Sequence, residues 1–365
     1  MNILILTTGT PSKHLIDALT ERQHTFDVYD PRDLGINISE QSGYDRVYHS
    51  QENLKTPVRL KAISYDAIVC RIGTDMMHSA SVLRHLNENL GIYCPQNANG
   101  IMIASDKLWS YQVLSQQRVK TINTYFTRRA NHVKYFVEQL GGLPIVGKTP
   151  TGSKGKGVFI LDSILSANSV LGLLHTQNVP VMLQRFVKSS STASNKKVAS
   201  SQGKRLIVVG DKVVCAMKKI SYDQDDFRDN LDRGAEGIDT IAQSYEIDLA
   251  IKATKALGLQ FAGVDLIADT DLEPTKDTFV IEVNSNPGVG IISITGHNYF
   301  IDLIELIENK INKLPDKNTD KKEEKEEPKS SHDRITAIMN KQENGERLTY
   351  DEHAILAFVQ SKNIF

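Results

Sequence analysis

The sequence predicts an α/β domain followed by an α+β body, and three observations point to this fold class. Short apolar runs alternate with amphipathic segments over residues 1–100, which is the pattern of a parallel sheet covered by helices. Beyond residue 123, predicted strands outnumber helices and several pair as hairpins. The chain of 365 residues is long enough for roughly two or three domains.

The first domain is predicted from its strands. Residues 3–6, 25–29 and 67–70 are short apolar runs, and helical spacing of apolar residues follows the first run and again covers residues 76–90. No GxGxxG fingerprint occurs in this block, so a dinucleotide is not indicated.

The second body combines hairpins with helices. Residues 204–209 and 212–217 flank a Gly-Asp turn, and residues 261–268 and 278–283 flank the polar loop 269–277. Helical periodicity marks three further segments, residues 106–116, 247–257 and 299–311.

Composition limits the classes of function. The chain carries 43 Lys and Arg against 44 Asp and Glu, so nothing suggests direct binding of nucleic acid through a cationic surface. We find neither a membrane-spanning apolar run nor a basic stretch before the first strand. The three cysteines lie far apart without a CxxC pair, which favours a reduced, cytoplasmic location.

The C-terminal part differs from the rest. Residues 315–331 are almost entirely Lys, Glu, Asp and other polar residues, and we expect a charged linker. Residues 332–365 then predict a helical tail, either a cap on the protein's own surface or an element that binds a partner. Residues 189–203 form a Ser-rich stretch that predicts a polar loop.

A candidate metal site lies on two apolar strands. Glu282 and Asn284 are two residues apart, so strand alternation puts both side chains on one face. Asp265 interrupts another apolar run, and a hairpin would bring it to the same face. Their oxygen atoms suit magnesium that also holds phosphates. The alternatives are a polar strand end and an Asp265 that is simply paired with Lys or Arg.

Two further segments carry residues that suit phosphate. Lys148 ends a predicted strand, and the glycine-rich stretch 152–157 follows it; glycines let backbone N–H groups approach phosphate. Arg228 and Arg233 bracket Asn230 in a charged stretch, and Arg pairs well with phosphate or carboxylate. Each stretch could equally be a solvated surface loop.

Taken in order, these motifs resemble the RimK-type glutamate ligases of the ATP-grasp superfamily. The similarity runs from about residue 1 to residue 311, and six short motifs recur in the family's order: Arg71-Ile72-Gly73, Asp106-Lys107, residues 144–148 with 152–157, residues 227–234, residues 262–265 and residues 282–288.

The resemblance implies an ATP-grasp fold with an N-terminal Rossmann-like pre-ATP-grasp domain and two lobes that clasp ATP. The domains would be residues 1–100, a first lobe with a glycine-rich lid over 101–183, and a second lobe with the metal site over 184–314. The linker and tail have no counterpart in the usual family pattern.

The resemblance also implies roles for individual residues. Arg228, Lys148 and Arg205 would be catalytic, and Asp265, Glu282 and Asn284 would bind two Mg²⁺ or Mn²⁺ ions. ATP would contact the following residues: Lys107, Lys148, Gly152, Ser153, Gly155, Gly157, Gln184, Arg185, Phe186, Val187, Arg228, Asp229 and Asn230.

Two positions depart from the family pattern. Gln184-Arg185 stands where the family usually has Gln-Glu at the hinge that binds adenine, and Gly203-Lys204-Arg205 stands where it usually has Asp-x-Arg. These changes affect the prediction of the substrate more than that of ATP use.

The expected function is an ATP-dependent carboxylate–amine ligase that works through an acyl phosphate and adds glutamate to a peptide or protein C-terminus. Its partners would be ATP, the amino acid and the acceptor, and the chain could form a homo-oligomer. Alternatives are a ligase acting on a small molecule or a natural-product peptide, and a degenerate ATP-binding scaffold whose tail recruits a partner.

Overall fold

The computed structural model describes residues 1–38, 46–51, 55–152, 157–189, 201–223, 228, 231, 234–269, 277–313 and 339–340. The chain divides into two units, Met1–Ile311 and Asn312–Phe365. All that follows concerns the first unit. The predicted linker lies outside the described residues, and so does the predicted tail apart from residues 339–340, which are helical.

The N-terminal part is the parallel α/β domain that the sequence predicts. β1 (Asn2–Thr7) lies between β2 (Thr25–Tyr29) and β6 (Ala67–Arg71) and pairs in parallel with both. Ser12 caps α1 (Lys13–Glu21) by accepting a hydrogen bond from the Leu15 amide. α2 (Met76–Arg84) continues into a π-helical turn, η3 (His85–Asn89), so the predicted helix over residues 76–90 changes its geometry at residue 85.

A second, small sheet in this domain is not predicted by the sequence. β3 (Leu34–Ile36), β4 (Val47–His49) and β5 (Val58–Leu60) form an antiparallel sheet with β4 in the middle. Each strand has only three residues, which is too short to show a two-residue alternation. Two 3₁₀ turns flank this region, η1 (Pro31–Asp33) and η2 (Ala62–Ser64).

A four-stranded antiparallel sheet follows in the order β7 (Thr124–Thr127), β10 (Val181–Arg185), β8 (Ile145–Lys148) and β9 (Val158–Leu161). η4 (Ala130–His132), α5 (Val133–Gln139) and α6 (Ile164–Thr176) accompany it. Apolar side chains from both α-helices and the sheet share one core, which includes Val137, Ile145, Leu171 and Leu183. This sheet therefore has a core of its own.

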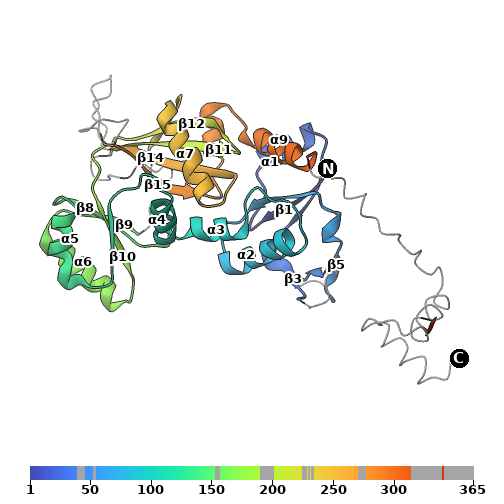
Figure 1. The fold of residues 1–365 in the computed structure, drawn as a ribbon, viewed down its shortest axis with the longest axis horizontal. Coiled ribbons are helices and arrows are strands. Elements are labelled where there is room, and N and C mark those ends of the chain that lie inside the picture. Colours follow the sequence, from blue (N-terminus) through green and yellow to red (C-terminus); the bar gives the residue numbers. More distant parts are fainter. Residues whose placement is uncertain are drawn as a thin grey trace. The chain divides into compact units, whose positions relative to one another are not determined.

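A five-stranded antiparallel sheet completes the body, in the order β13 (Glu236–Asp239), β12 (Lys212–Ser221), β11 (Ser201–Val209), β14 (Phe261–Ala268) and β15 (Thr278–Asn284). Both predicted hairpins, β11–β12 and β14–β15, are confirmed. β11 begins at Ser201, so the predicted Ser-rich loop over residues 189–203 extends too far, because its last three residues pair with β12. α7 (Ser244–Ala256) contacts the sheet (Figure 1).

The remaining helices link these parts. α3 (Ala98–Ser105) and α4 (Lys107–Gln116) lead from the N-terminal domain into the body, and α8 (Gly290–Thr295) and α9 (Tyr299–Ile311) follow β15. α9 lies beside α1 (Figure 1), and Glu308 accepts a hydrogen bond of 2.9 Å from Nε of Arg22. One apolar core joins β1 to α9 and to the five-stranded sheet. None of the described helices is both long and apolar enough to cross a bilayer.

Candidate functional site

The β14–β15 hairpin determines how the predicted metal ligands are arranged. Asp265 lies opposite Glu282, and Asn284 lies opposite Gly263. Directly opposite residues of an antiparallel pair share a face, as do residues two apart on one strand. A bulge follows Asp265, where Ile281 has no partner in the register. The hairpin therefore presents Asp265, Glu282 and Asn284 on one face of the sheet.

Gly263 allows the segment after β15 to fold back over this hairpin. A Cβ atom built on Gly263 would lie 2.8 Å from Cβ of Pro287, closer than packed carbon atoms approach. The strand can therefore keep Pro287 against Gly263 only because glycine has no side chain.

Asp265 is held by two cations from the neighbouring strands. Arg205, opposite it on β11, donates from Nε to Oδ1 at 2.7 Å and from Nη2 to Oδ2 at 2.6 Å. Nζ of Lys219 on β12 lies 3.6 Å from Oδ2. Burial alone would raise the pKa of Asp265, but Arg205 and Lys219 hold it below its ordinary value. Asp265 is thus an ionised carboxylate in a pair, as the simpler interpretation of the sequence expects.

The pairing of Asp265 is compatible with a metal ion. Each carboxylate oxygen has two lone pairs, so oxygens that accept from Arg205 can still coordinate a cation. The three side chains together supply two carboxylates and one amide oxygen, a donor set that fits Mg²⁺ or Mn²⁺. In the part of the chain that the structure describes, no cluster of three or more His, Cys, Asp or Glu side chains offers another metal site.

Three predicted phosphate-binding cations gather around the β8–β9 hairpin. Lys148 is the last residue of β8 and is buried. Lys107, at the start of α4, donates from Nζ to the Gly152 carbonyl at 2.5 Å. Arg228 donates from Nη1 to the Val158 carbonyl at 3.3 Å. A cationic side chain from another segment therefore donates a hydrogen bond to the backbone on each side of the predicted lid.

Gly157 closes this hairpin in a conformation that favours glycine. Its φ is +73°, and an added Cβ would overlap the Thr149 side chain. Its carbonyl accepts from the Thr149 amide at 3.0 Å. The predicted contacts Ser153 and Gly155 in the loop, and Asp229 and Asn230 beyond it, lie outside the described residues.

The predicted adenine hinge begins at the end of β10, an inner strand of the four-stranded sheet. Gln184 is buried in β10, and its Nε2 donates to Oγ1 of Thr124 at 2.7 Å. Phe186 and the buried Val187 come directly after the strand. Arg185, which replaces the usual Glu, donates to Oδ2 of Asp269 at 2.8 Å and lies 5.4 Å from the centre of the Phe279 ring. The departure from the family pattern therefore has an ion-pair partner within this chain.

We expect Arg185→Ala to lower the free energy of unfolding by about 1–2 kcal/mol, because Asp269 is buried and loses a charge-assisted hydrogen bond. Chemical denaturation measures this change. Arg32→Ala is the matched control, since Arg32 pairs with Asp30 at an exposed position, and it should change stability little. Equal effects of the two substitutions would contradict a structural role of the Arg185–Asp269 pair.

Near the candidate site, the structure shows contacts of three residues to which the sequence analysis assigned no role. Lys219, near the end of β12, contacts Asp265, and a buried lysine of this kind is itself a signal. Asn286 donates from Nδ2 to the Ile72 carbonyl at 3.0 Å, and Arg71 donates from Nη2 to the Pro287 carbonyl at 2.8 Å. These contacts connect the N-terminal domain to the segment after the metal strand.

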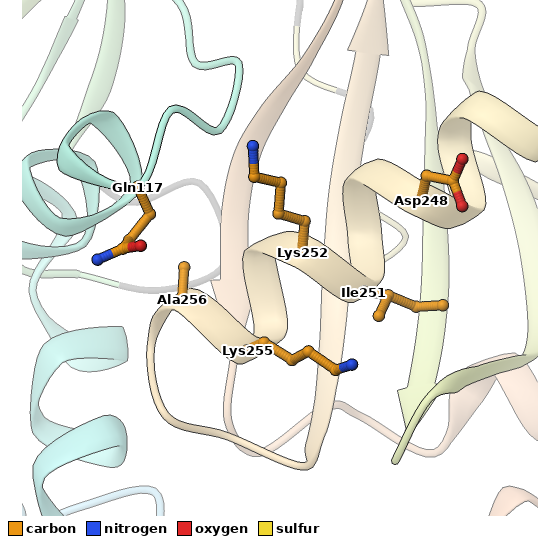
Figure 2. A pocket seen from close by; sticks show the side chains of 6 residues that line it. All are labelled: Gln117, Asp248, Ile251, Lys252, Lys255 and Ala256. Carbon is orange, nitrogen blue, oxygen red and sulfur yellow. The ribbon is translucent and has the colours of Figure 1, made fainter.

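A surface pocket beside α7 contains none of the predicted site residues. It is lined by Gln117, Asp248, Ile251, Lys252, Lys255 and Ala256 (Figure 2). Lys252 donates to the Arg118 carbonyl at 3.0 Å. Side-chain chemistry and strand register therefore define the candidate site, and this pocket is not part of it.

The two antiparallel sheets and the preceding parallel domain form the fold of solved ATP-grasp structures, and curated relatives are named as ligases, so the class of protein is an ATP-grasp ligase. Residues 104–307 match the RimK-like ATP-grasp domain and residues 1–101 match the RimK PreATP-grasp domain. The chain belongs to the RimK-like ATP-grasp family.

Known proteins similar to this chain include curated ligases and solved ATP-grasp structures. A "Probable alpha-L-glutamate ligase" of Pseudoalteromonas translucida is 32% identical over 299 residues, which cover 81% of this chain and 91% of that protein. The structure of ATP-grasp ligase PsnB, complexed with minimal precursor, Mg and ADP, has a TM-score of 0.61 at 14% identity. The match covers 85% of this chain and 98% of the PsnB chain. D-cycloserine synthetase DcsG has a TM-score of 0.58 at 14% identity, and the match covers 85% of this chain and 99% of that one.

Proposed function

We propose that this ligase adds glutamate to the C-terminal carboxylate of a peptide or protein. In the first step a carboxylate oxygen attacks the γ-phosphorus of ATP, and ADP leaves. In the second step the amino group of glutamate attacks the acyl carbon, a proton is lost and phosphate leaves with the bonding electrons. The products are an amide, ADP and phosphate.

The side chains around the β8–β9 hairpin would handle the phosphates. Phosphoryl transfer depends mainly on positioning and on neutralising charge. Lys107 and Lys148 would hold the phosphates of ATP, and Arg228 would stabilise the transferred group. Arg205 would be the fourth cation, because it reaches the candidate metal face through Asp265. We also propose that residues 152–157 close over the phosphates and limit hydrolysis of the acyl phosphate.

The metal face is the observation that carries the proposal. Asp265, Glu282 and Asn284 would hold two Mg²⁺ or Mn²⁺ ions, which supply positive charge to the phosphates during transfer. The opposition of Asp265 to Glu282 in the strand register supports this assignment. Residues 184–187 would bind adenine through their backbone, as the hinge between the two sheets.

The substrates are inferred from the similar proteins. The name of the Pseudoalteromonas relative contains glutamate, and PsnB was solved with a precursor. These support glutamate as the amino acid and a peptide chain as the acceptor. We also propose that the domains divide at residues 100, 183 and 314. We further propose that the chain forms a homo-oligomer, and light scattering would test this assembly.

The test is to detect the product by mass. The full chain is incubated with ATP, Mg²⁺, L-glutamate and a peptide library with free C-termini, and a second library carries amidated C-termini. We expect the mass of one or more glutamyl residues to appear only on free C-termini, together with ATP-dependent phosphate release. Additions to the amidated library, or no addition to either, would contradict the proposed acceptor.

A small-molecule ligase is the second candidate, because D-cycloserine synthetase shares the fold across 85% of this chain. It predicts phosphate release with small carboxylates and amines and none with the peptide library. A degenerate scaffold is not supported, because the curated relatives are named as ligases.

A further inference from the structure

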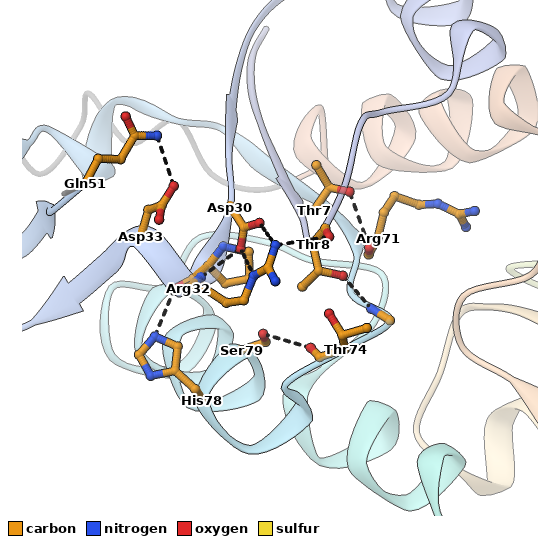
Figure 3. A network of polar contacts seen from close by, with 12 residues as sticks. Thr7, Thr8, Asp30, Arg32, Asp33, Gln51, Arg71, Thr74, His78 and Ser79 are labelled. Carbon is orange, nitrogen blue, oxygen red and sulfur yellow. Dashed lines mark hydrogen bonds and ion pairs between the residues drawn. The ribbon is translucent and has the colours of Figure 1, made fainter. Parts of the chain in front are cut away.

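Arg71 lies at a place where open α/β sheets bind ligands, and the proposed chemistry leaves it without a role. It is the last residue of β6, at the carboxyl end of a parallel sheet. The polar network around this edge is satisfied internally: Arg32 pairs with Asp30, and the Gly73 amide donates to Oγ1 of Thr8. Figure 3 shows the Arg71 guanidinium pointing away from that network.

The guanidinium of Arg71 has contacts but no carboxylate partner among the described residues. Nη2 donates to the Pro287 carbonyl at 2.8 Å, and the guanidinium carbon lies 5.3 Å from the centre of the Phe300 ring. Nη1 is shielded from solvent and makes no hydrogen bond within the described part of the chain. Burial lowers the pKa of Arg71, and the opposing influences come from Tyr299 and Cys70.

A guanidinium that is shielded from solvent and lacks a carboxylate partner is suited to binding an anionic ligand. Shielding a charge from water costs free energy unless an opposite charge compensates for it. Arg71 as a residue is of intermediate exposure, although Nη1 of its guanidinium is shielded from solvent. Arg also binds carboxylates with two parallel hydrogen bonds, which makes a carboxylate a fitting partner.

Arg71 is also close to the proposed site of reaction. Pro287, which it contacts, follows Glu282 and Asn284 by only a few residues. Asn286 donates from Nδ2 to the Ile72 carbonyl at 3.0 Å, and its Oδ1 is buried without a partner in the described residues. Two crossed contacts therefore join the segment of Arg71 to the segment of Asn286, and within the described part of the chain each of these residues carries one unused polar atom, the donor Nη1 and the acceptor Oδ1.

The donor on Arg71 and the acceptor on Asn286 suit the carboxylate and the amino group of a free amino acid. We propose that Arg71 binds the α-carboxylate of the incoming amino acid and that Asn286 orients its amino group toward the acyl phosphate. This inference rests on the proposed function. A free amino acid suits the site better than a peptide, because both unused atoms are shielded from solvent and a chain must continue out to water.

The test measures binding rather than turnover. Calorimetry with ADP and Mg²⁺ present compares the Kd of L-glutamate, of its α-amide L-isoglutamine and of its γ-amide L-glutamine. The wild-type protein should bind L-glutamate about 10–100-fold more tightly than L-isoglutamine, which is the worth of a charge-assisted contact. Arg71→Gln should bind the two equally.

Two variants make the result specific. Arg71→Lys keeps the charge but loses the fork, so its preference for L-glutamate should be intermediate, and it carries the test if Arg71→Gln does not fold. Arg32→Gln changes an arginine at the same sheet edge that already pairs with Asp30, and it should keep the full preference.

Three results would overturn the inference. The first is a full preference for L-glutamate over L-isoglutamine in both Arg71 variants, and the second is a wild-type protein without that preference. The third is an Arg71→Gln protein that still prefers L-glutamate to L-isoglutamine but no longer prefers it to L-glutamine. The last result would assign Arg71 to the side-chain carboxylate. The mass assay above decides the proposed function separately: binding that depends on Arg71 without any glutamyl product would refute the proposed ligation and leave the site intact.

Discussion

Glu282→Gln should lower the rate of ATP-dependent ligation by about 10²–10³-fold or more and leave the protein folded. The substitution keeps the shape of the side chain but removes the negative charge that the proposed metal ions require. Losing one preorganised electrostatic contact typically costs about 10²–10³ in rate. Glu282 is only partly buried at the end of β15, so its neutralisation should disturb packing little. Phosphate release at saturating ATP, measured over a range of Mg²⁺ concentrations, gives the effect.

Glu236→Gln is the matched control for this prediction. Glu236 is an exposed glutamate on β13, the edge strand on the opposite side of the sheet from β15, and its neutralisation should leave the rate unchanged. Circular dichroism checks the fold of both variants. A Glu282→Gln protein with wild-type turnover and wild-type dependence on Mg²⁺ would refute the assignment of Glu282 as a metal ligand.

Asp265→Asn should lower the free energy of unfolding by about 3 kcal/mol, because breaking a buried ion pair leaves its partners uncompensated. Arg205 would keep at most one of its two hydrogen bonds, to the amide oxygen, and Arg205 and Lys219 would both lose the negative charge of Asp265. For a unit of this size the melting temperature should fall by roughly 5 °C or more. Differential scanning calorimetry measures both quantities.

The pH dependence of this effect has a definite sign. The pKa of Asp265 in the folded protein lies below its model-compound value of 3.8. The stabilisation by ionised Asp265 is therefore fully present above about pH 4 and is lost as the pH falls through the folded-state pKa. The stability gap between wild type and Asp265→Asn should accordingly be constant near neutral pH and should shrink in acid.

Asp302→Asn is the control for the ion-pair prediction. Asp302 pairs with His297 at 2.6 Å, but both side chains are far more exposed than Asp265, so its loss should cost no more than about 1 kcal/mol. If Asp265→Asn is as stable as Asp302→Asn, the Arg205–Asp265 pair does not stabilise the sheet as the geometry indicates.

Local patterns in the sequence were enough to predict the hairpin that carries the candidate metal ligands. Two apolar runs separated by a polar loop predict β14 and β15, and the two-residue period of a strand relates Glu282 to Asn284. The fold class followed from similar local signals and from the order of the motifs, and the family comparisons confirm it. The roles of the individual site residues stay predictions, as do the substrate and the lid.

Contacts between segments far apart in the chain were decided only by the tertiary structure. Asp265 meets Arg205 because β11 and β14 are neighbours in the sheet, and sheet order does not follow from alternation within a strand. Arg71 meets Pro287 across 216 positions of sequence, where no local signal exists. Turn chemistry and periodicity are properties of adjacent residues and can be recognised in the sequence, whereas the partner of a buried charge depends on which strands and domains pack together.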